Sequence, residues 1–244
     1  NLDVQAVEER LKTGRAPHVI TAVHFAGLPC DMERLIRLKR KHGFLLVEDA
    51  AHALGARYKV EDGWYQVGQH PEVDATILSF HPVKHVTTGE GGAVLVHDAA
   101  LAARLRRLRS HGIDPEGELA LPGYLRRSSD EFAPDGRHTP WFRPMTELGF
   151  NHRLTDLQAA LGTSQLGKLA TFLKMRNAIA ARYRNELAGF GLPSEDQSDR
   201  TNAWHLFVVR CGADERDDLL RHLHTKGIRA QVHYYPVPLQ PWFL

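Results

Sequence analysis

Short apolar runs alternate with segments of helical periodicity from residue 17 onward, and this alternation most constrains the fold. The β-branched run at 17–25 (PHVITAVHF) precedes a segment at 32–43 whose apolar residues keep helical spacing up to Gly43. Three further apolar runs lie at 44–50 (FLLVEDA), 74–80 (DATILSF) and 91–98 (GGAVLVHD). Their nearly continuous apolar character is typical of buried strands in a mostly parallel sheet. The sequence therefore predicts an α/β domain.

The second half of the chain begins with a helix at 101–112, which Gly112 ends. Residues 114–146 are rich in Pro, Gly, Ser and charged residues, and we interpret them as a long loop. The leucine spacing of 153–189 predicts a long helix. Thr155 and Gln158 form a capping box at its start, and Gly162 and Gly167 bend or divide it.

The last third of the chain shows an α+β pattern, with a strand at 203–210, a helix at 215–227 and a strand at 228–235. We place a domain boundary near residue 165. This divides the chain into a large domain at 1–165 and a small C-terminal α+β domain at 166–244. Because the chain opens without Met and stops at PWFL, we interpret it as a fragment that lacks part of the large domain at its N-terminus and is incomplete at its C-terminus.

Composition bounds the class of protein but not its function. Hydrophobic residues make up 43% and charged residues 25% of the chain, as in ordinary soluble proteins. The formal net charge of +2 gives no bias towards nucleic acid. Cys30 and Cys211 lie far apart, with no metal-ligand spacing around them, and no segment approaches the ~20 apolar residues that span a bilayer. We expect a cytoplasmic protein without a membrane anchor or a metal site.

Asp49 and Lys84 are the first candidates for chemistry. Asp49 closes one predicted strand and Lys84 follows another, so parallel strands would bring both to the carboxyl edge of the sheet, where ligands gather. A lysine can form an imine with an aldehyde cofactor and then act as general acid and base, and a carboxylate can pair with a pyridinium nitrogen. Each residue also has an ordinary interpretation: Asp49 as a helix cap and Lys84 as a surface lysine.

Three neighbouring features fit the same interpretation. The Ser79 hydroxyl and the GEGG turn at 89–92 could donate to a phosphate, although the glycines equally fit a tight turn before a strand. His52 is placed to contact a planar ring, although a structural role is the ordinary one for any of the 15 histidines.

Three motifs together resemble the DegT/StrS family of sugar aminotransferases, which adopt the aspartate-aminotransferase type of pyridoxal 5'-phosphate (PLP) fold. They are EDAAHALG at 48–55, SFHPVKHVTTGEGG at 79–92 and GFNHRLTDLQAALG at 149–162, and they occur in the family's order and at family-like separations. The resemblance implies that Lys84 is the Schiff-base lysine, that Asp49 pairs with the pyridine nitrogen and that His52 contacts the cofactor ring. It also implies that Ser79 binds the cofactor phosphate and that Asn151 reaches the phosphate of a neighbouring subunit's cofactor, in a homodimer with shared active sites.

Within this family, SFHPVKHVTTGEGG and QVHYYPVPLQP at 231–241 are most similar to the transaminase of pseudaminic acid synthesis. That similarity implies a UDP-linked 4-keto-6-deoxy-N-acetyl hexosamine as substrate and glutamate as amino donor. The residues expected to hold the nucleotide sugar are Arg153, Gln231, Val232, His233 and Tyr234. Family members carry a further N-terminal portion with phosphate and substrate contacts, which this chain lacks.

Four other functions compete with this interpretation. One is a family aminotransferase for another nucleotide sugar, for example a dTDP-linked one, and another is a sugar dehydratase of the same fold. The dehydratases have histidine in place of the family lysine, so Lys84 favours transamination. The third is a non-catalytic PLP-fold regulatory protein, which need not keep Asp49, Ser79 and Lys84 together. The fourth is a generic α/β binding module, if the motifs are coincidental.

Overall fold

The computed structural model describes residues 1–14, 16–114, 143–188, 190–192 and 198–243. The chain divides into two compact units. Unit 1 comprises Asn1–Ile179 and Glu195–Leu206, and unit 2 comprises Ala180–Ser194 and Phe207–Leu244. This division differs from the boundary expected near residue 165, which stays a prediction for the domains of the whole protein.

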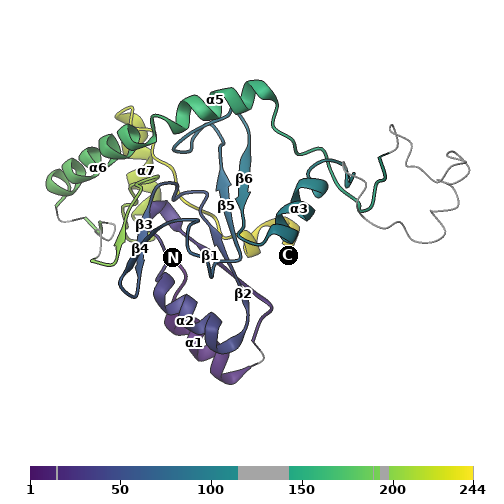
Figure 1. Cartoon of the computed structure of the whole chain (residues 1–244). Helices are drawn as coiled ribbons and strands as arrows, with labels where there is room; N and C mark the ends of the chain where they lie inside the picture. Colours follow the sequence, from purple (N-terminus) through teal and green to yellow (C-terminus); the bar gives the residue numbers. More distant parts are fainter. Residues whose placement is uncertain (15, 115–142, 189, 193–197, 244) are drawn as a thin grey trace, which may run out of the picture. The chain divides into compact units, whose positions relative to one another are not determined.

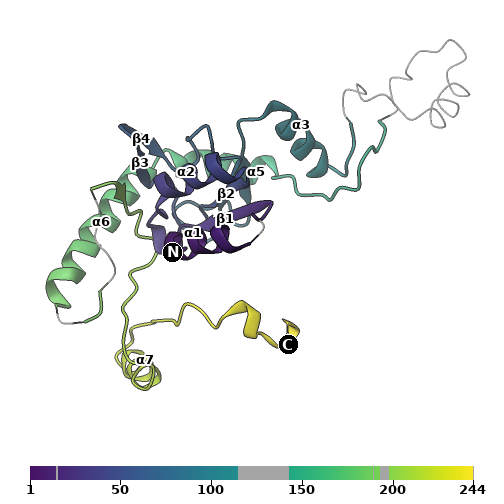
Figure 2. The ribbon, with the colours of Figure 1, turned by 90° about the horizontal axis from the view of Figure 1, so that it is seen from below.

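Strands predominate in the first hundred residues, and helices predominate afterwards (Figures 1 and 2). The described α-helices are α1 (Val4–Thr13), α2 (Met32–His42), α3 (Ala99–Leu108), α5 (Asp156–Leu166), α6 (Leu169–Glu186) and α7 (Arg216–Thr225). The described strands are β1 (Val19–Val23), β2 (Leu45–Asp49), β3 (Arg57–Val60), β4 (Gly63–Gln66), β5 (Ala75–Ser79), β6 (Gly92–Leu95) and β7 (Arg200–Thr201). Short 3-10 turns occur at Phe25–Gly27, Val237–Leu239 and Pro241–Phe243.

The main sheet has the strand order β1-β2-β5-β6. Strand β2 pairs in parallel with both β1 and β5, whereas β6 runs antiparallel to β5. The expectation of a mostly parallel α/β sheet is therefore confirmed. A second, antiparallel sheet has the order β4-β3-β7. Its β3–β4 hairpin was not predicted, although the Asp–Gly pair at 62–63 between alternating apolar residues is the sequence signal for one.

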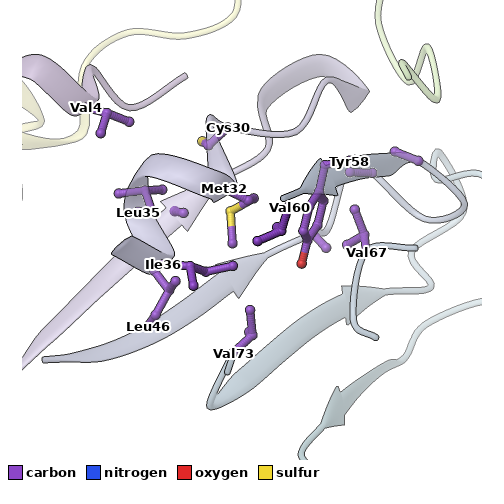
Figure 3. Packing of buried hydrophobic residues seen from close by; sticks show 14 of the residues in the cluster. Val4, Cys30, Met32, Leu35, Ile36, Leu46, Tyr58, Val60, Val67 and Val73 are labelled. Carbon is purple, nitrogen blue, oxygen red and sulfur yellow. The ribbon is translucent and has the colours of Figure 1, made fainter. Parts of the chain in front are cut away.

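Helix α2 covers one face of the main sheet because its apolar residues recur at helical spacing. Its buried residues are Met32, Leu35, Ile36 and Leu38. They share a core with Leu46 of β2 and with Tyr58 and Val60 of β3 (Figure 3). The Asp31 carboxylate accepts a hydrogen bond from the Arg34 amide at the start of α2, and Gly43 ends the helix in the left-handed region (φ 74°).

The opposite face of the main sheet is open in the described part of the chain. Val19, Leu45 and Ile77 are 46%, 51% and 40% exposed. The apolar residues on both faces of these strands predicted a sheet that is buried on both sides. Among the described residues, only one face of the sheet is buried. The carboxyl edge of the sheet, at the ends of β2 and β5, is thus supported from the face that α1 and α2 cover.

The later helices follow their local sequence signals. The Thr155–Gln158 capping box forms at the start of α5, and the predicted long helix is divided at Gly167 into α5 and α6. Helix α7 lies within the segment expected to be helical. Of the loop expected at 114–146, residues 115–142 lie outside the described residues.

Two predicted strands are wrong. Residues 203–206 form no strand because their backbone bonds to a turn of unit 1: the Ala203 amide donates to the Gly27 carbonyl, and the Leu206 amide to the Ala26 carbonyl. Trp204 also has a positive φ of 50°, which interrupts an extended chain. Residues 228–235 are mostly exposed and pair with no strand among the described residues.

Candidate active site

Asp49 and Lys84 lie close enough at the carboxyl edge of the main sheet for their charges to interact. Asp49 ends β2 beside Ile77 of β5, and Lys84 follows β5 by five residues. Burial lowers the pKa of Lys84, and the Asp49 carboxylate partly offsets this effect. A partly desolvated lysine is easier to deprotonate, and a neutral amine is the nucleophilic form.

Asp49 caps a turn, not a helix. Its Oδ1 accepts a hydrogen bond from the Ala51 amide at 3.1 Å, and residues 51–55 form turns. Its own carbonyl accepts from the His24 amide at 3.0 Å, and the next amide, of Ala50, donates to the Ile77 carbonyl at 2.9 Å. The helix-cap interpretation of Asp49 is therefore wrong for the described residues.

The loop that carries Lys84 is anchored on its C-terminal side by buried residues. His85 and Val86 are buried next to it, and the Lys84 amide donates to the His81 carbonyl at 2.9 Å. Further along, the Thr88 amide donates to the Phe80 carbonyl at 3.0 Å. The loop thus holds the Lys84 backbone while the side chain stays partly accessible.

Ser79 and the GEGG turn adjoin this loop. Ser79 is the last residue of β5, and the Phe80 amide donates to the Gly91 carbonyl at 2.8 Å. A Cβ on Gly92 would lie 2.7 Å from the Leu78 carbonyl oxygen, so a side chain there would collide with β5. Gly92 therefore has a steric reason to lack a side chain, and phosphate binding by Ser79 and the GEGG segment stays a prediction.

His52 sits against a turn that precedes α2. Its Nδ1 accepts a hydrogen bond from the Ala26 amide at 3.3 Å, and its ring centroid lies 5.9 Å from that of Phe25. On another side it lies 4.4 Å from the ring of His205. His52 is thus held by segments far apart in the sequence.

His85 and His205 join this group, and neither was predicted from the sequence. Their ring centroids are 5.5 Å apart, and His85 Nε2 lies 2.9 Å from the Ala203 carbonyl oxygen. Burial lowers the pKa of His85 to about 4 and that of His205 to about 3, with Lys84 adding to both shifts. The Nδ1 atoms of both rings are buried without a hydrogen-bond partner in the described part of the molecule. The two histidines lie more than 100 residues apart, so no local sequence pattern links them.

A buried polar group lies behind Asp49 on the covered face of the sheet. Glu48 is fully buried, and its Oε2 accepts from the Gly68 amide at 2.9 Å and from the Thr76 hydroxyl at 2.7 Å. Its Oε1 lies 3.4 Å from His24 Nε2. Burial opposes the charge, yet His24, Thr76 and Tyr58 outweigh it and lower the pKa of Glu48. Glu48 therefore fixes the end of the strand that presents Asp49.

Asn151 and Arg153 lie in the segment that precedes α5. Asn151 forms a β-bridge with Ser110, and the next residue, His152, donates through its amide to the Arg109 carbonyl. Asn151 and Arg153 are exposed. No described contact joins either residue to Lys84, and their expected roles stay predictions.

Gln231, Val232, His233 and Tyr234 belong to unit 2. His233 is half-buried, the other three are exposed, and the His233 and Tyr234 rings lie 4.6 Å apart.

The residues that the structure describes contain no group of three or more His, Cys, Asp or Glu side chains that could hold a metal ion. Among the same residues, no helix combines the length and apolar character needed to cross a bilayer.

Known proteins of the same family resemble the chain along its whole length. The sequence profile of the DegT/DnrJ/EryC1/StrS aminotransferase family matches residues 1–244. Members of this family are PLP-dependent. Among solved structures, DesV of S. venezuelae in complex with a ketimine intermediate is 34% identical, with a TM-score of 0.78 over 99% of this chain and 57% of that one.

Two other relatives agree. The Helicobacter pylori aminotransferase PseC, involved in the biosynthesis of pseudoaminic acid, is 26% identical, with a TM-score of 0.77 over 100% of this chain and 59% of that one. The uncharacterized protein MJ1066 of Methanocaldococcus jannaschii is 32% identical over 250 residues, which cover 100% of this chain and 59% of that protein. The chain thus spans under two thirds of the length of these relatives. Its fold is that of the PLP-dependent aminotransferases, and the chain belongs to the DegT/DnrJ/EryC1/StrS aminotransferase family.

Proposed function

We propose that the protein containing this chain is a PLP-dependent aminotransferase that moves an amino group, from glutamate, to a nucleotide-linked keto-sugar. The observation that carries the proposal is the pair at the carboxyl edge of the sheet. Lys84 has a lowered pKa there, and the charge of Asp49 acts on it. Membership of the aminotransferase family supports the same reaction.

The residues at the strand ends fit PLP. The cofactor supplies an aldehyde carbon and an electron-accepting ring. Lys84 would hold that carbon through Nζ and, once released, would move a proton between carbon atoms as general acid and base. Asp49 would keep a proton on the ring nitrogen by placing a negative charge beside it. The two unpartnered ring nitrogens of His85 and His205 mark this place as one where a further polar group fits.

His52 and Ser79 would orient the cofactor. We assign His52 to contact with the cofactor ring and Ser79, with the backbone amides of the GEGG turn, to its phosphate. Asn151 would complete the phosphate site of a partner subunit in a homodimer. This assignment accords with the exposure of Asn151 and with the absence of described contacts between it and Lys84.

Arg153 and the segment Gln231–Tyr234 would hold the nucleotide sugar. The proposed substrate is a UDP-linked 4-keto-6-deoxy-N-acetyl hexosamine used in surface-glycan synthesis, as in pseudaminic acid formation, and the proposed location is the cytoplasm. The resemblance of QVHYYPVPLQP to the pseudaminic acid transaminase and the structural match to PseC support this substrate. A dTDP-linked nucleotide sugar is the alternative substrate within the family.

Labelling tests the cofactor lysine. The purified protein is treated with PLP and borohydride and its peptides are mapped; we expect the label on Lys84. Lys84→Arg keeps the positive charge but should abolish labelling. The control Lys59→Arg, in β3, should leave it unchanged. Label on another lysine would refute the assignment, and a protein that binds no PLP would favour the generic α/β binding module.

A substrate panel tests the proposed reaction. The protein is incubated with glutamate and either UDP-linked or dTDP-linked 4-keto sugars, and 2-oxoglutarate and amino-sugar are measured. We expect amination of the UDP-linked sugar. Activity confined to small keto acids would refute a nucleotide-sugar substrate, and a preference for the dTDP-linked sugar would transfer the proposal to that substrate.

A further inference from the structure

The function proposed above assigns no chemical step to His205, yet its ring packs directly on His52, which would contact the cofactor. Its ring centroid lies 4.4 Å from that of His52, with an angle of 42° between the rings. Lys84 is also close enough for its charge to lower the pKa of His205. His205 therefore lies in the same group of side chains as Lys84 and His52.

The hydrogen bond from the Ala26 amide determines the tautomer of His52. A backbone amide can only donate, so His52 Nδ1, at 3.3 Å, must accept and carries no proton. The neutral ring then has its proton on Nε2. Ala26 has a positive φ of 61°, an uncommon conformation for a residue with a side chain.

The turn and the His205 backbone are tied together. The Leu206 amide donates to the Ala26 carbonyl at 3.2 Å, and the Ala203 amide to the Gly27 carbonyl at 2.9 Å. Gly27 (φ 109°) admits no side chain, since a Cβ would lie 2.7 Å from the Trp204 amide nitrogen. The amide that bonds to His52 and the ring that packs on it thus belong to one hydrogen-bonded layer.

A second support comes from helix α6. Arg176 donates through Nη1 to the Trp204 carbonyl at 2.9 Å and lies 3.4 Å from the His205 carbonyl. The charged and titratable groups that act on His205 are His52, Lys84, His85 and Arg176, and all oppose its protonation. With burial, they lower the pKa of His205 to about 3. His205 is thus a neutral, planar ring at any pH near neutrality.

We propose that His205 is a positioning residue: its ring and the Ala26 amide together hold His52 in one orientation and in its Nε2–H tautomer. The consequence for catalysis rests on the proposed function, because a fixed His52 would present the same donor to the cofactor at every turnover. The positioning itself is a property of the protein without cofactor.

Two variants of His205 distinguish the effect of a planar ring from the effect of side-chain volume. His205→Phe keeps a planar ring, whereas His205→Leu keeps apolar volume without one. The exposed His18→Ala is the control, and a His52→Gln sample assigns the His52 signals. Each protein is labelled with 15N-histidine and studied by NMR without cofactor, after circular dichroism has shown that it is folded.

We expect the wild type, His205→Phe and His18→Ala to show the Nε2–H form of His52 alone. In His205→Leu the His52 signals should move to values averaged between tautomers, and the Ala26 amide should exchange with solvent about tenfold faster. A His205→Leu protein with wild-type His52 signals and wild-type Ala26 exchange would overturn the proposal. PLP labelling of Lys84 in the same samples is independent: its failure in the wild type refutes the proposed function and leaves the positioning role standing.

Discussion

Removal of the Glu48 carboxylate should destabilise unit 1 strongly, because the residue is fully buried and joins several polar groups. In Glu48→Ala, the Gly68 amide and the Thr76 hydroxyl lose the acceptor that lies 2.9 and 2.7 Å away. His24, 3.4 Å away, loses its charged neighbour. Each buried donor left unpaired costs about 1–3 kcal/mol, and breaking a buried charge pair costs about 3–5 kcal/mol. Since these costs overlap, we expect a total loss of about 3–5 kcal/mol.

Glu48→Gln isolates the charge from the volume. The amide oxygen can still accept from both donors, which bond to the same oxygen of Glu48, and only the interaction with His24 is lost, so the loss should be smaller, about 1–3 kcal/mol. The control Glu61→Gln removes an exposed partner of Arg40 and should leave the unfolding free energy unchanged within error. Urea titration followed by circular dichroism measures all three variants.

The contribution of the Glu48 carboxylate should be lost at low pH. The folded-state pKa of Glu48 is lowered, so its contribution is fully present above the unfolded value of about 4.3 and is lost as pH falls through the folded value. The difference between wild type and Glu48→Gln should therefore shrink below about pH 4. A loss under about 1 kcal/mol in Glu48→Ala at pH 7 would refute the description of Glu48 as the anchor of the β2 end.

Three further predictions concern the site and its support. Asp49→Asn should bind PLP but nearly abolish transamination, because the ring nitrogen loses its carboxylate; half-reaction kinetics measure this, and wild-type rates would restrict Asp49 to its turn. If the site is shared, a mixture of Lys84→Ala and Asn151→Ala proteins that exchange subunits should recover part of the activity that each lacks alone, since one site in each heterodimer is intact. Demonstrated exchange without recovery would place Asn151 in the site of its own chain. Gly27→Ala should lower the melting temperature, because a Cβ there collides with the backbone. Gly43 also has a positive φ but has open space around it, so Gly43→Ala should lower the melting temperature less. Equal effects would show that backbone strain from the positive φ alone matters.

Local signals in the sequence predicted most of the first half of the fold. The apolar run that became β2 and the helical spacing that became α2 are properties of consecutive residues. The caps are equally local, since Thr155 and Gln158 lie three residues apart and bond to each other's backbone. Such elements need no distant partner to be recognised.

The segments at 203–210 and 228–235 show where local pattern fails. Both are rich in apolar and aromatic residues, yet a strand also needs a neighbour with free backbone groups. At Ala203 and Leu206 those hydrogen bonds go to the turn at Ala26 and Gly27 instead. Only the three-dimensional arrangement of the chain determines this choice.

The sequence by itself determined the identity and order of the chemical groups. It also indicated that Asp49 and Lys84 meet at one edge of the sheet, because parallel strands bring their carboxyl ends together. The tertiary structure decided their surroundings. It placed His205, 153 residues after His52, against that ring, and it buried Glu48 beneath the strand end. Tautomer and pKa depend on distances of a few ångströms to groups that folding brings together, and no spacing along the chain encodes those distances.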